Sequence, residues 1–185
     1  LTFDITRLKL AEAQLEREAR FDPLTGVANR RHFEERLALA IARGRHQPVA
    51  LAVLYLDIDF LKPINDRYGH AAGDLVIRSF AERVVGCVRD ADLVARIGGD
   101  EFVVLSEHVD AEEANEAAEH TARAVIALMS EPVMFGEIAL RSGVSIGIAV
   151  TQSVQQADTL IAEADRALYA AKAAGRNTWR RADAH

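Results

Sequence analysis

The 185-residue sequence is poor in several features that mark particular classes of protein. Its single cysteine, Cys87, excludes an internal disulfide and fits a reducing compartment. We expect Cys87 to lie on the apolar stripe of a helix, as part of the core. No apolar run approaches the ~20 residues that a bilayer-spanning helix needs. These absences predict a soluble cytoplasmic domain, in a parent protein that is either soluble or membrane-anchored.

Clustered positive charge and zinc-ligand spacing are lacking as well. Lysine and arginine number 22 against 28 aspartates and glutamates, which leaves a formal net charge of −6. A nucleic-acid-binding surface needs clustered basic residues, so nucleic acid is not an expected partner. The six histidines show no metal-ligand spacing, so zinc is not expected. With half of its residues hydrophobic, the chain is instead typical of one globular domain of ordinary size.

Two glycines followed by two acids form the most informative stretch of the sequence. Short β-branched segments, Leu93–Ile97 and Phe102–Leu105, flank Gly98–Glu101 and predict a β-hairpin with the acids at its tip. Glycine allows a backbone to approach a ligand closely. Adjacent carboxylates are hard oxygen ligands of the kind that Mg²⁺ takes when it bridges phosphates. A polar hairpin turn without a ligand is the plain alternative.

A second pair of acids follows an apolar run upstream. Residues 50–56 are continuously hydrophobic, which predicts a strand buried on both faces, and Asp57-Ile58-Asp59 comes next. If the strand ends at Asp57, that carboxylate alone projects from the sheet edge into a site. A strand-terminating turn rich in aspartate is the other common interpretation. The two acidic clusters together suggest neighbouring strands that deliver carboxylates to one Mg²⁺–phosphate site.

The remaining periodicity predicts helices that alternate with strands. We expect helices over about 30–43, 73–88, 111–129 and 156–174, and further strands near 134–140 and 143–150. Gly175 is a good C-terminal cap for the last helix. Helices that alternate with hairpins imply an α+β fold, in which helices flank a central mixed, largely antiparallel sheet.

Five short motifs occur in a fixed order along residues 21–180. They are Asp22–Arg31 (DPLTGVANRR), Asp57–Asp66 (DIDFLKPIND), Gly98–Phe102 (GGDEF), Ala164–Tyr169 (ADRALY) and Gly175–Asn177 (GRN). Together they resemble the GGDEF domain, the catalytic module of bacterial diguanylate cyclases. The resemblance implies the ferredoxin-like palm of nucleotide cyclases and polymerases, and a catalytic domain over residues 21–182.

The resemblance also implies a reaction. Two GTP molecules would condense into cyclic di-GMP and two pyrophosphates, each 3′-hydroxyl attacking the α-phosphorus of the other nucleotide. In phosphoryl transfer the protein positions groups and neutralises charge, with Mg²⁺, or alternatively Mn²⁺, as the cofactor. By family correspondence, Asp57, Asp100 and the Ile58 carbonyl are the metal ligands. Glu101 is the third catalytic acid, either a further ligand or the group that helps deprotonate the 3′-hydroxyl.

Two residues match the family's guanine-reading positions, Asn65 and Asp74. A carboxylate accepts from both the N1–H and the exocyclic amine of guanine, whereas adenine offers no donor at N1. A mismatched base leaves such groups unpaired and is therefore rejected. Taken alone, Asp74 after Gly73 suggests a helix N-cap, and Asn65 suggests a turn residue.

The triphosphate of GTP needs hydrogen-bond donors. Lys172 and Arg176 match the family's phosphate-binding positions, although cations near the end of a helix also complement its dipole. Backbone amides around Phe60 and Leu61 are further donors, in the turn expected after Asp57.

A possible regulatory motif precedes the acidic hairpin. Arg89 and Asp92 form an RxxD sequence, with five residues between Asp92 and Gly98. This registration matches the family's inhibitory site, where cyclic di-GMP binds away from the active site. The planar fork of arginine suits both phosphate and guanine edges. A charged loop between a helix and a strand is the plain alternative.

The N-terminal segment predicts a charged helix over Leu8–Arg20. Leu8 and Leu15 fit heptad positions, although Glu12 interrupts the stripe. With Asp4–Thr6 before it, the segment resembles the exit from a PAS sensor domain. We therefore expect residues 1–20 to be the end of an upstream sensor and a signalling linker helix. A solvated helix that packs on its own domain is the alternative.

The leading hypothesis is an active, product-inhibited diguanylate cyclase. A symmetric product made from two identical substrates favours a C₂ homodimer with facing half-sites. The first alternative is a non-catalytic module that binds GTP or cyclic di-GMP; such domains usually lose a motif acid, and Asp100 and Glu101 are both present. The second is a cyclase that uses ATP or makes a mixed dinucleotide, against which Asp74 argues.

Overall fold

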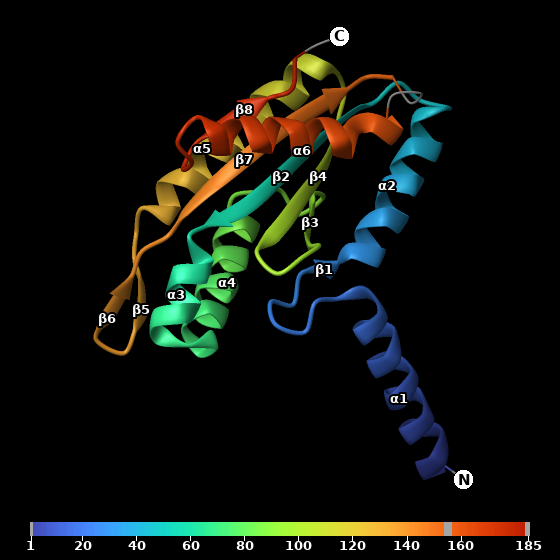
Figure 1. The fold of residues 1–185 in the computed structure, drawn as a ribbon. Coiled ribbons are helices and arrows are strands. Elements are labelled where there is room, and N and C mark those ends of the chain that lie inside the picture. The colour runs from blue at the N-terminus through green and yellow to red at the C-terminus, as the bar shows by residue number, and fades with distance from the viewer. Residues whose placement is uncertain (1, 154–156, 184–185) are drawn as a thin grey trace.

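A six-stranded mixed sheet forms the centre of the computed structural model, which describes residues 2–153 and 157–183 (Figure 1). In spatial order its strands are β1 (Ala28–Asn29), β3 (Leu93–Arg96), β4 (Glu101–His108), β2 (Ala50–Asp59), β7 (Gly143–Thr151) and β8 (Trp179–Arg181). The inner pairs are antiparallel, and the two edge strands pair in parallel. The predicted α+β class, with a largely antiparallel sheet, is confirmed.

Helices cover both faces of the sheet (Figure 1). One face carries α2 (Arg30–Gly44) and α6 (Ala157–Ala173), and the other carries α3 (Leu61–Tyr68), α4 (His70–Val85) and α5 (Ala111–Met129). A separate hairpin of β5 (Val133–Phe135) and β6 (Ile138–Leu140) contacts α4. Successive residues of β2 point to opposite faces, so Val53 belongs to the α2/α6 core and Leu54 to the α4/α5 core.

Strand β2 is central, and each of its residues is buried. The predicted burial on both faces is therefore confirmed, but the strand continues past Asp57 to Asp59. The extension is possible because β7 runs alongside it, pairing Asp59 with Gly143. The carboxylate of Asp59 is buried and hydrogen-bonded, which compensates for its removal from water.

The segment after β2 differs from the prediction. Residues 61–68 form helix α3 rather than a turn, so the interpretation of Asn65 as a turn residue is wrong. Gly69, with a φ of 88°, ends α3 and directly precedes α4. Because α4 begins at His70 rather than at Gly73, Asp74 lies inside the helix, and its interpretation as an N-cap is wrong as well.

Other bounds agree to different degrees. The helices predicted over 30–43 and 111–129 correspond closely to α2 and α5, whereas the predicted strand over 134–140 is the hairpin β5–β6. Cys87 lies after the end of α4, half-buried against the core, and is not on a helical stripe. The predicted start of the last helix, at position 156, lies outside the described residues.

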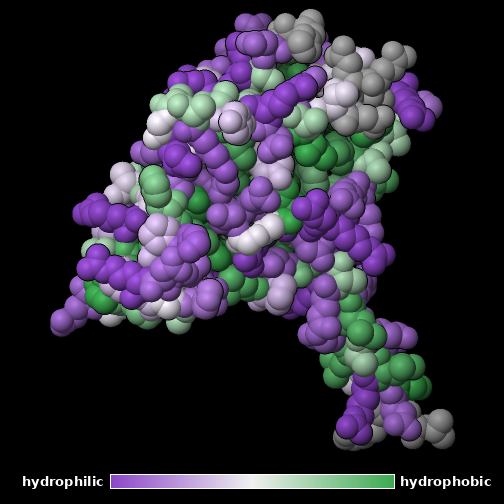
Figure 2. Space-filling model, in the orientation of Figure 1, coloured by the Kyte–Doolittle hydropathy of each residue, from purple (hydrophilic) through white to green (hydrophobic). Residues whose placement is uncertain are grey.

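Helix α1 (Thr2–Arg20) projects from the body of the molecule, and Figure 2 shows apolar surface along it. Leu8 and Leu15 are 61% and 66% exposed, so the alternative in which this helix packs on its own domain is wrong. Its C-terminal end is held by Asn29, which donates to the Ala19 carbonyl at 3.0 Å and accepts from the His32 amide as the N-cap of α2. Among the described residues, no helix has the length and apolarity that spanning a membrane requires.

Candidate active site

The ends of β2 and β4 bring the two acidic clusters together. Asp57 pairs directly with Glu101 across the antiparallel ladder, and the Ile58 amide donates to the Asp100 carbonyl at 3.1 Å. Directly opposite residues of an antiparallel pair lie on the same face of the sheet. The two strands are therefore neighbours, as their sequences suggest.

A cleft of about 250 Å³ opens at this end of the sheet. Of the residues that the sequence singled out, its lining contains Asp57, Ile58, Phe60, Leu61, Asp100, Lys172 and Arg176. They come from the strand end, the acidic hairpin, the start of α3 and the end of α6. Glu101, Asn65 and Asp74 are not part of this lining. The structure thus brings the acids and the expected phosphate donors together.

Lys172 forms an ion pair with Asp57 inside the cleft. Burial raises the pKa of Asp57; the hydrogen bond from Lys172 opposes this and the charge of Asp100 adds to it, with a resulting pKa of about 6. Burial disfavours the charged form of Lys172, but the carboxylates of Asp57, Asp100 and Glu101 outweigh it and raise the pKa of Lys172 above its ordinary value. Three acids therefore act on Lys172, and the cleft lining brings acids together with cations that include Arg176.

The donor set fits Mg²⁺ that binds together with a nucleotide. Among the described residues, no group of three or more histidines, cysteines or acids is arranged to hold a metal by itself. Mg²⁺ commonly uses one or two protein carboxylates and completes its shell with water and substrate phosphates. Asp57 and Asp100, with the carbonyl of Ile58, provide hard oxygen donors of this kind in the cleft.

Glu101 lies beside the cleft. Its carboxylate rests against the tip of the hairpin, where Oε2 stands 2.7 Å from the position that a Cβ on Gly98 would occupy.

Tyr55 on β2 is affected by Glu101. Burial, followed by the charge of Glu101, raises the pKa of Tyr55 to about 12. The sequence did not single out Tyr55, because in an apolar run it reads as one more core residue.

Asn65 packs against Gly73, the residue that precedes Asp74 in α4. The Oδ1 atom of Asn65 lies 1.8 Å from where a Cβ on Gly73 would be, so only glycine lets α3 and α4 approach this closely. Asn65 and Asp74 are both half-buried on these neighbouring helices. The packing of Asn65 against Gly73 was not evident from the sequence, since α3 was not predicted.

Phe60 and Arg176 face each other across the cleft. Phe60 begins α3 with a φ of 60°, and the Arg176 guanidinium lies 5.5 Å from the centroid of its ring. The first backbone amides of a helix have no intrahelical partner and favour anions. Lys172 lies in the last turn of α6, where a cation complements the helix dipole, and it also forms the ion pair with Asp57.

The opening motif supports the acidic hairpin. Arg96 donates to the Gly99 carbonyl at 2.8 Å through Nη2 and contacts Asp22 at 3.3 Å through Nη1. Arg30 donates to the Ile97 carbonyl at 2.9 Å. The hairpin tip is therefore tied to residues more than sixty positions earlier in the chain. Arg96 lies two residues before Gly98, but nothing in the local sequence identifies Asp22 as its partner.

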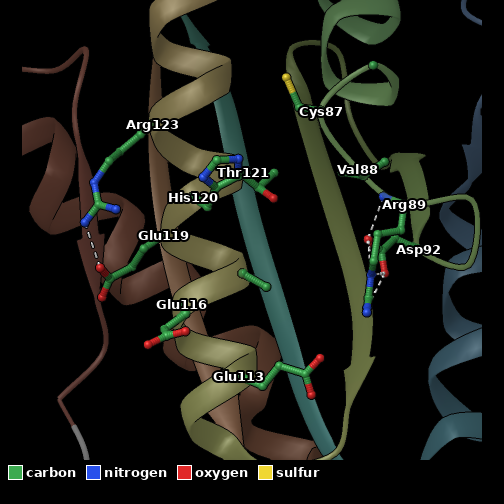
Figure 3. Close-up of a pocket in the computed structure, with 12 residues that line it drawn as sticks. Cys87, Val88, Arg89, Asp92, Glu113, Glu116, Glu119, His120, Thr121 and Arg123 are labelled. Atoms are coloured by element: carbon green, nitrogen blue, oxygen red, sulfur yellow. Dashed lines mark hydrogen bonds and ion pairs between the residues drawn. The ribbon is translucent and has the colours of Figure 1, made fainter.

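Arg89 and Asp92 lie at a separate, larger cavity of about 680 Å³. Figure 3 shows them on a loop that faces α5, with the Arg89 side chain directed at Asp92. Nη2 of Arg89 donates to Asp92 at 2.8 Å and to the Glu107 carbonyl at 3.1 Å. The hydrogen bond to Asp92 raises the pKa of Arg89, and the pair holds the loop in place.

Comparisons with known proteins place the chain in a family. A family model described as "Diguanylate cyclase, GGDEF domain" matches residues 19–178. Diguanylate cyclase TpbB of Pseudomonas aeruginosa is 40% identical over 182 residues, which are 96% of this chain and 40% of TpbB. Cyclic di-GMP phosphodiesterase NbdA of the same organism is 35% identical over 94% of this chain and 22% of NbdA. The chain thus spans less than half the length of these relatives.

A solved structure matches the whole architecture. The coiled coil and GGDEF domain of DgcB from Caulobacter crescentus, in complex with c-di-GMP, has a TM-score of 0.87 and 29% identity to this chain. The match covers 98% of this chain and 95% of that one. The chain belongs to the GGDEF diguanylate cyclase domain family.

Proposed function

We propose that the chain condenses two GTP molecules into cyclic di-GMP and two pyrophosphates. The observation that carries the proposal is the convergence of Asp57, Asp100, Lys172 and Arg176 on one cleft. This set combines oxygen ligands for a divalent cation with donors for phosphate. The retained motif acids and the relatives named diguanylate cyclases favour the same activity.

The acids would hold Mg²⁺, or Mn²⁺, through the carboxylates of Asp57 and Asp100 and the Ile58 carbonyl. When bound, the cation offsets phosphate charge and lowers the pKa of the attacking 3′-hydroxyl. Glu101, beside the cleft, is either a further ligand or the acceptor of the hydroxyl proton. Glu101 lies directly opposite Asp57 in the antiparallel ladder, a position that suits a metal ligand and a proton acceptor equally.

The remaining site residues would bind the nucleotide. Lys172 and Arg176 donate to the triphosphate, together with the backbone amides of Phe60 and Leu61 at the start of α3. Asn65 and Asp74 read the guanine edge. The close packing of α3 on α4 supports this pairing, because it sets the two polar side chains on adjacent helices.

The monomer offers one half-site, and the reaction needs two nucleotides. We infer a C₂ homodimer in which two such clefts face each other. The exposed Leu8 and Leu15 on the projecting α1 suit a helix that pairs with its copy and receives a signal from an upstream sensor, for which a PAS domain is the candidate. Residues 1–20 would then be the linker and residues 21–182 the catalytic domain.

Arg89 and Asp92 would bind cyclic di-GMP as an inhibitory product. The large cavity between their loop and α5 provides room outside the acidic cleft. To accept a phosphate or guanine edge, the Arg89 fork must exchange part of its bonding to Asp92 for bonding to the ligand.

A non-catalytic GTP- or cyclic di-GMP-binding module is the second candidate function. The relative NbdA supports this candidate, because it is named a phosphodiesterase although it is similar to this chain. Membership of the family therefore does not by itself assign cyclase activity. Incubation with GTP or ATP and Mg²⁺, followed by mass analysis of the products, separates the hypotheses. We expect cyclic di-GMP from GTP alone. Asp100→Ala should abolish it while leaving the circular dichroism spectrum unchanged, and exposed Glu34→Ala is the matched control.

Binding of GTP without any product from the wild-type chain would instead favour the module. A product from ATP would favour the other cyclase alternative.

A further inference from the structure

A buried carboxylate in the lining of the acidic cleft has no role in the proposed chemistry. Asp59 is 4% exposed, and both of its oxygens are bonded. Oδ1 accepts from the hydroxyl of the fully buried Ser145 at 2.8 Å, and Oδ2 accepts from the backbone N–H of Asn177 at 2.9 Å. A charge at this depth is costly without such partners. The carboxylate is therefore tied to the segment that follows α6.

That segment, Gly175–Asn177, has an unusual backbone. Arg176 and Asn177 adopt φ angles of 65° and 47°, in the left-handed region that side-chain-bearing residues rarely use. Such conformations persist only where the surroundings determine them. Asp59 supplies one constraint. Gly143 supplies another, because a Cβ there would stand 2.9 Å from Asn177 Oδ1 and 3.2 Å from its Cβ.

The turn carries Arg176 into the cleft. Its guanidinium lies over Phe60, which also has a left-handed φ, of 60°, and which directly follows Asp59 in the chain. Asp59 is thus bonded to the residue after Arg176 and adjacent to the residue beneath it. One buried side chain links the two walls of the cleft where the phosphates are expected.

We propose that Asp59 is a positioning residue for Arg176. By accepting from the Asn177 amide, it holds the turn from which the guanidinium reaches the triphosphate, and Ser145 orients the carboxylate for that bond. The inference rests on the proposed function in taking GTP as the ligand. It assigns a separate task to each acid of the Asp57-Ile58-Asp59 sequence: the first faces the ligand, and the second fixes the turn that binds it.

The test is a double-mutant cycle between Asp59→Asn and Arg176→Ala. Asparagine keeps the shape of aspartate but is uncharged and has one acceptor oxygen, so it cannot offer the Asn177 amide a charge-assisted hydrogen bond. We expect Asp59→Asn to raise KM for GTP about tenfold, as for the loss of one charge-assisted hydrogen bond, and to change kcat by less than about twofold. In the Arg176→Ala background, the same change should raise KM by less than about twofold.

A structural role alone would give equal effects in both backgrounds and would overturn the proposal, as would an unchanged KM. Ser145→Ala, which leaves the Asn177 bond in place, is the control and should raise KM less than Asp59→Asn does. If Asp59→Asn does not fold, Gly143→Ala decides the question, because its Cβ displaces Asn177 without altering Asp59. It should raise KM in the wild-type background and not in the Arg176→Ala background.

Calorimetric titration with a non-hydrolysable GTP analogue and Mg²⁺ separates this inference from the proposed activity. If the wild-type chain binds the analogue but makes no cyclic di-GMP, the cyclase proposal fails, and the same cycle measured on Kd still decides the role of Asp59. If the chain makes cyclic di-GMP and the cycle shows no coupling, the role of Asp59 fails alone. Absence of binding by the wild-type chain overturns both.

Discussion

Replacing Asp57 by Asn should make the stability of the cation-free fold depend less on pH. In the folded chain, burial and the neighbouring Asp100 hold the pKa of Asp57 at about 6, compared with an ordinary value of 3.8. The folded state therefore keeps a proton that the unfolded chain has released. Because the folded pKa is the higher one, this group favours folding at low pH, and its contribution is lost as the pH rises from about 3.8 to about 6.

The size of the effect follows from the two pKa values. Across the whole window the shift corresponds to about 3 kcal/mol, and the side chain is only 10% exposed, so solvent screening is small. Between about pH 4.5 and about pH 7.5, the linkage relation gives a loss of about 2 kcal/mol for the wild-type chain. Asn at this position has no proton to lose and can still accept from Lys172.

Urea unfolding in the presence of EDTA measures this difference. The free energy of unfolding of Asp57→Asn minus that of wild type should increase by about 2 kcal/mol from about pH 4.5 to about pH 7.5. Groups that do not interact with Asp57 cancel in the comparison. A difference that stays constant within about 0.5 kcal/mol over this range would refute the reasoning, since Asp57 would then titrate alike in both states.

Three further predictions concern specificity, feedback and assembly. Asp74→Ala should reduce the ratio of kcat/KM for GTP over ATP by at least about tenfold, because the guanine donors lose their acceptor; an unchanged ratio contradicts guanine reading. Arg89→Ala should leave the initial rate unchanged but raise the concentration of cyclic di-GMP for half-inhibition by roughly tenfold, whereas exposed Arg78→Ala changes neither. Inhibition unaffected by Arg89→Ala argues against the feedback site. Removal of residues 1–20 should shift sedimentation towards the monomer, and identical association of both chains counts against the linker.

The sequence predicts the four inner strands of the sheet but not the edge strands β1 and β8, which are only two and three residues long. A continuous hydrophobic run of this length, such as 50–56, is typical of a buried strand, and the acids at its end mark one edge of the sheet. Helix α3 was missed because its eight residues include Pro63 and have only one buried turn. The contact between Asn65 and Gly73 was missed for the same reason, because it depends on how α3 packs on α4.

Within the candidate site, residue types were predictable but partners were not. The acids and cations belong to recognisable motifs, and these motifs supply the residues that line the cleft at one end of the sheet. The pairing of Lys172 with Asp57, and of Arg96 with Asp22, joins positions far apart in the chain, so no local pattern encodes it. Asp59 looks equivalent to Asp57 in sequence, and only the continuation of β2 alongside β7 buries it.

Asn29 gives the joint between α1 and the rest of the chain a particular mechanical character. Its side-chain nitrogen donates to the last turn of the projecting helix, and its side-chain oxygen accepts from the first turn of α2. A torque applied to the far end of α1 would therefore reach α2 through this one side chain. In the proposed homodimer, motion of an upstream sensor would in this way reorient one cleft relative to the other.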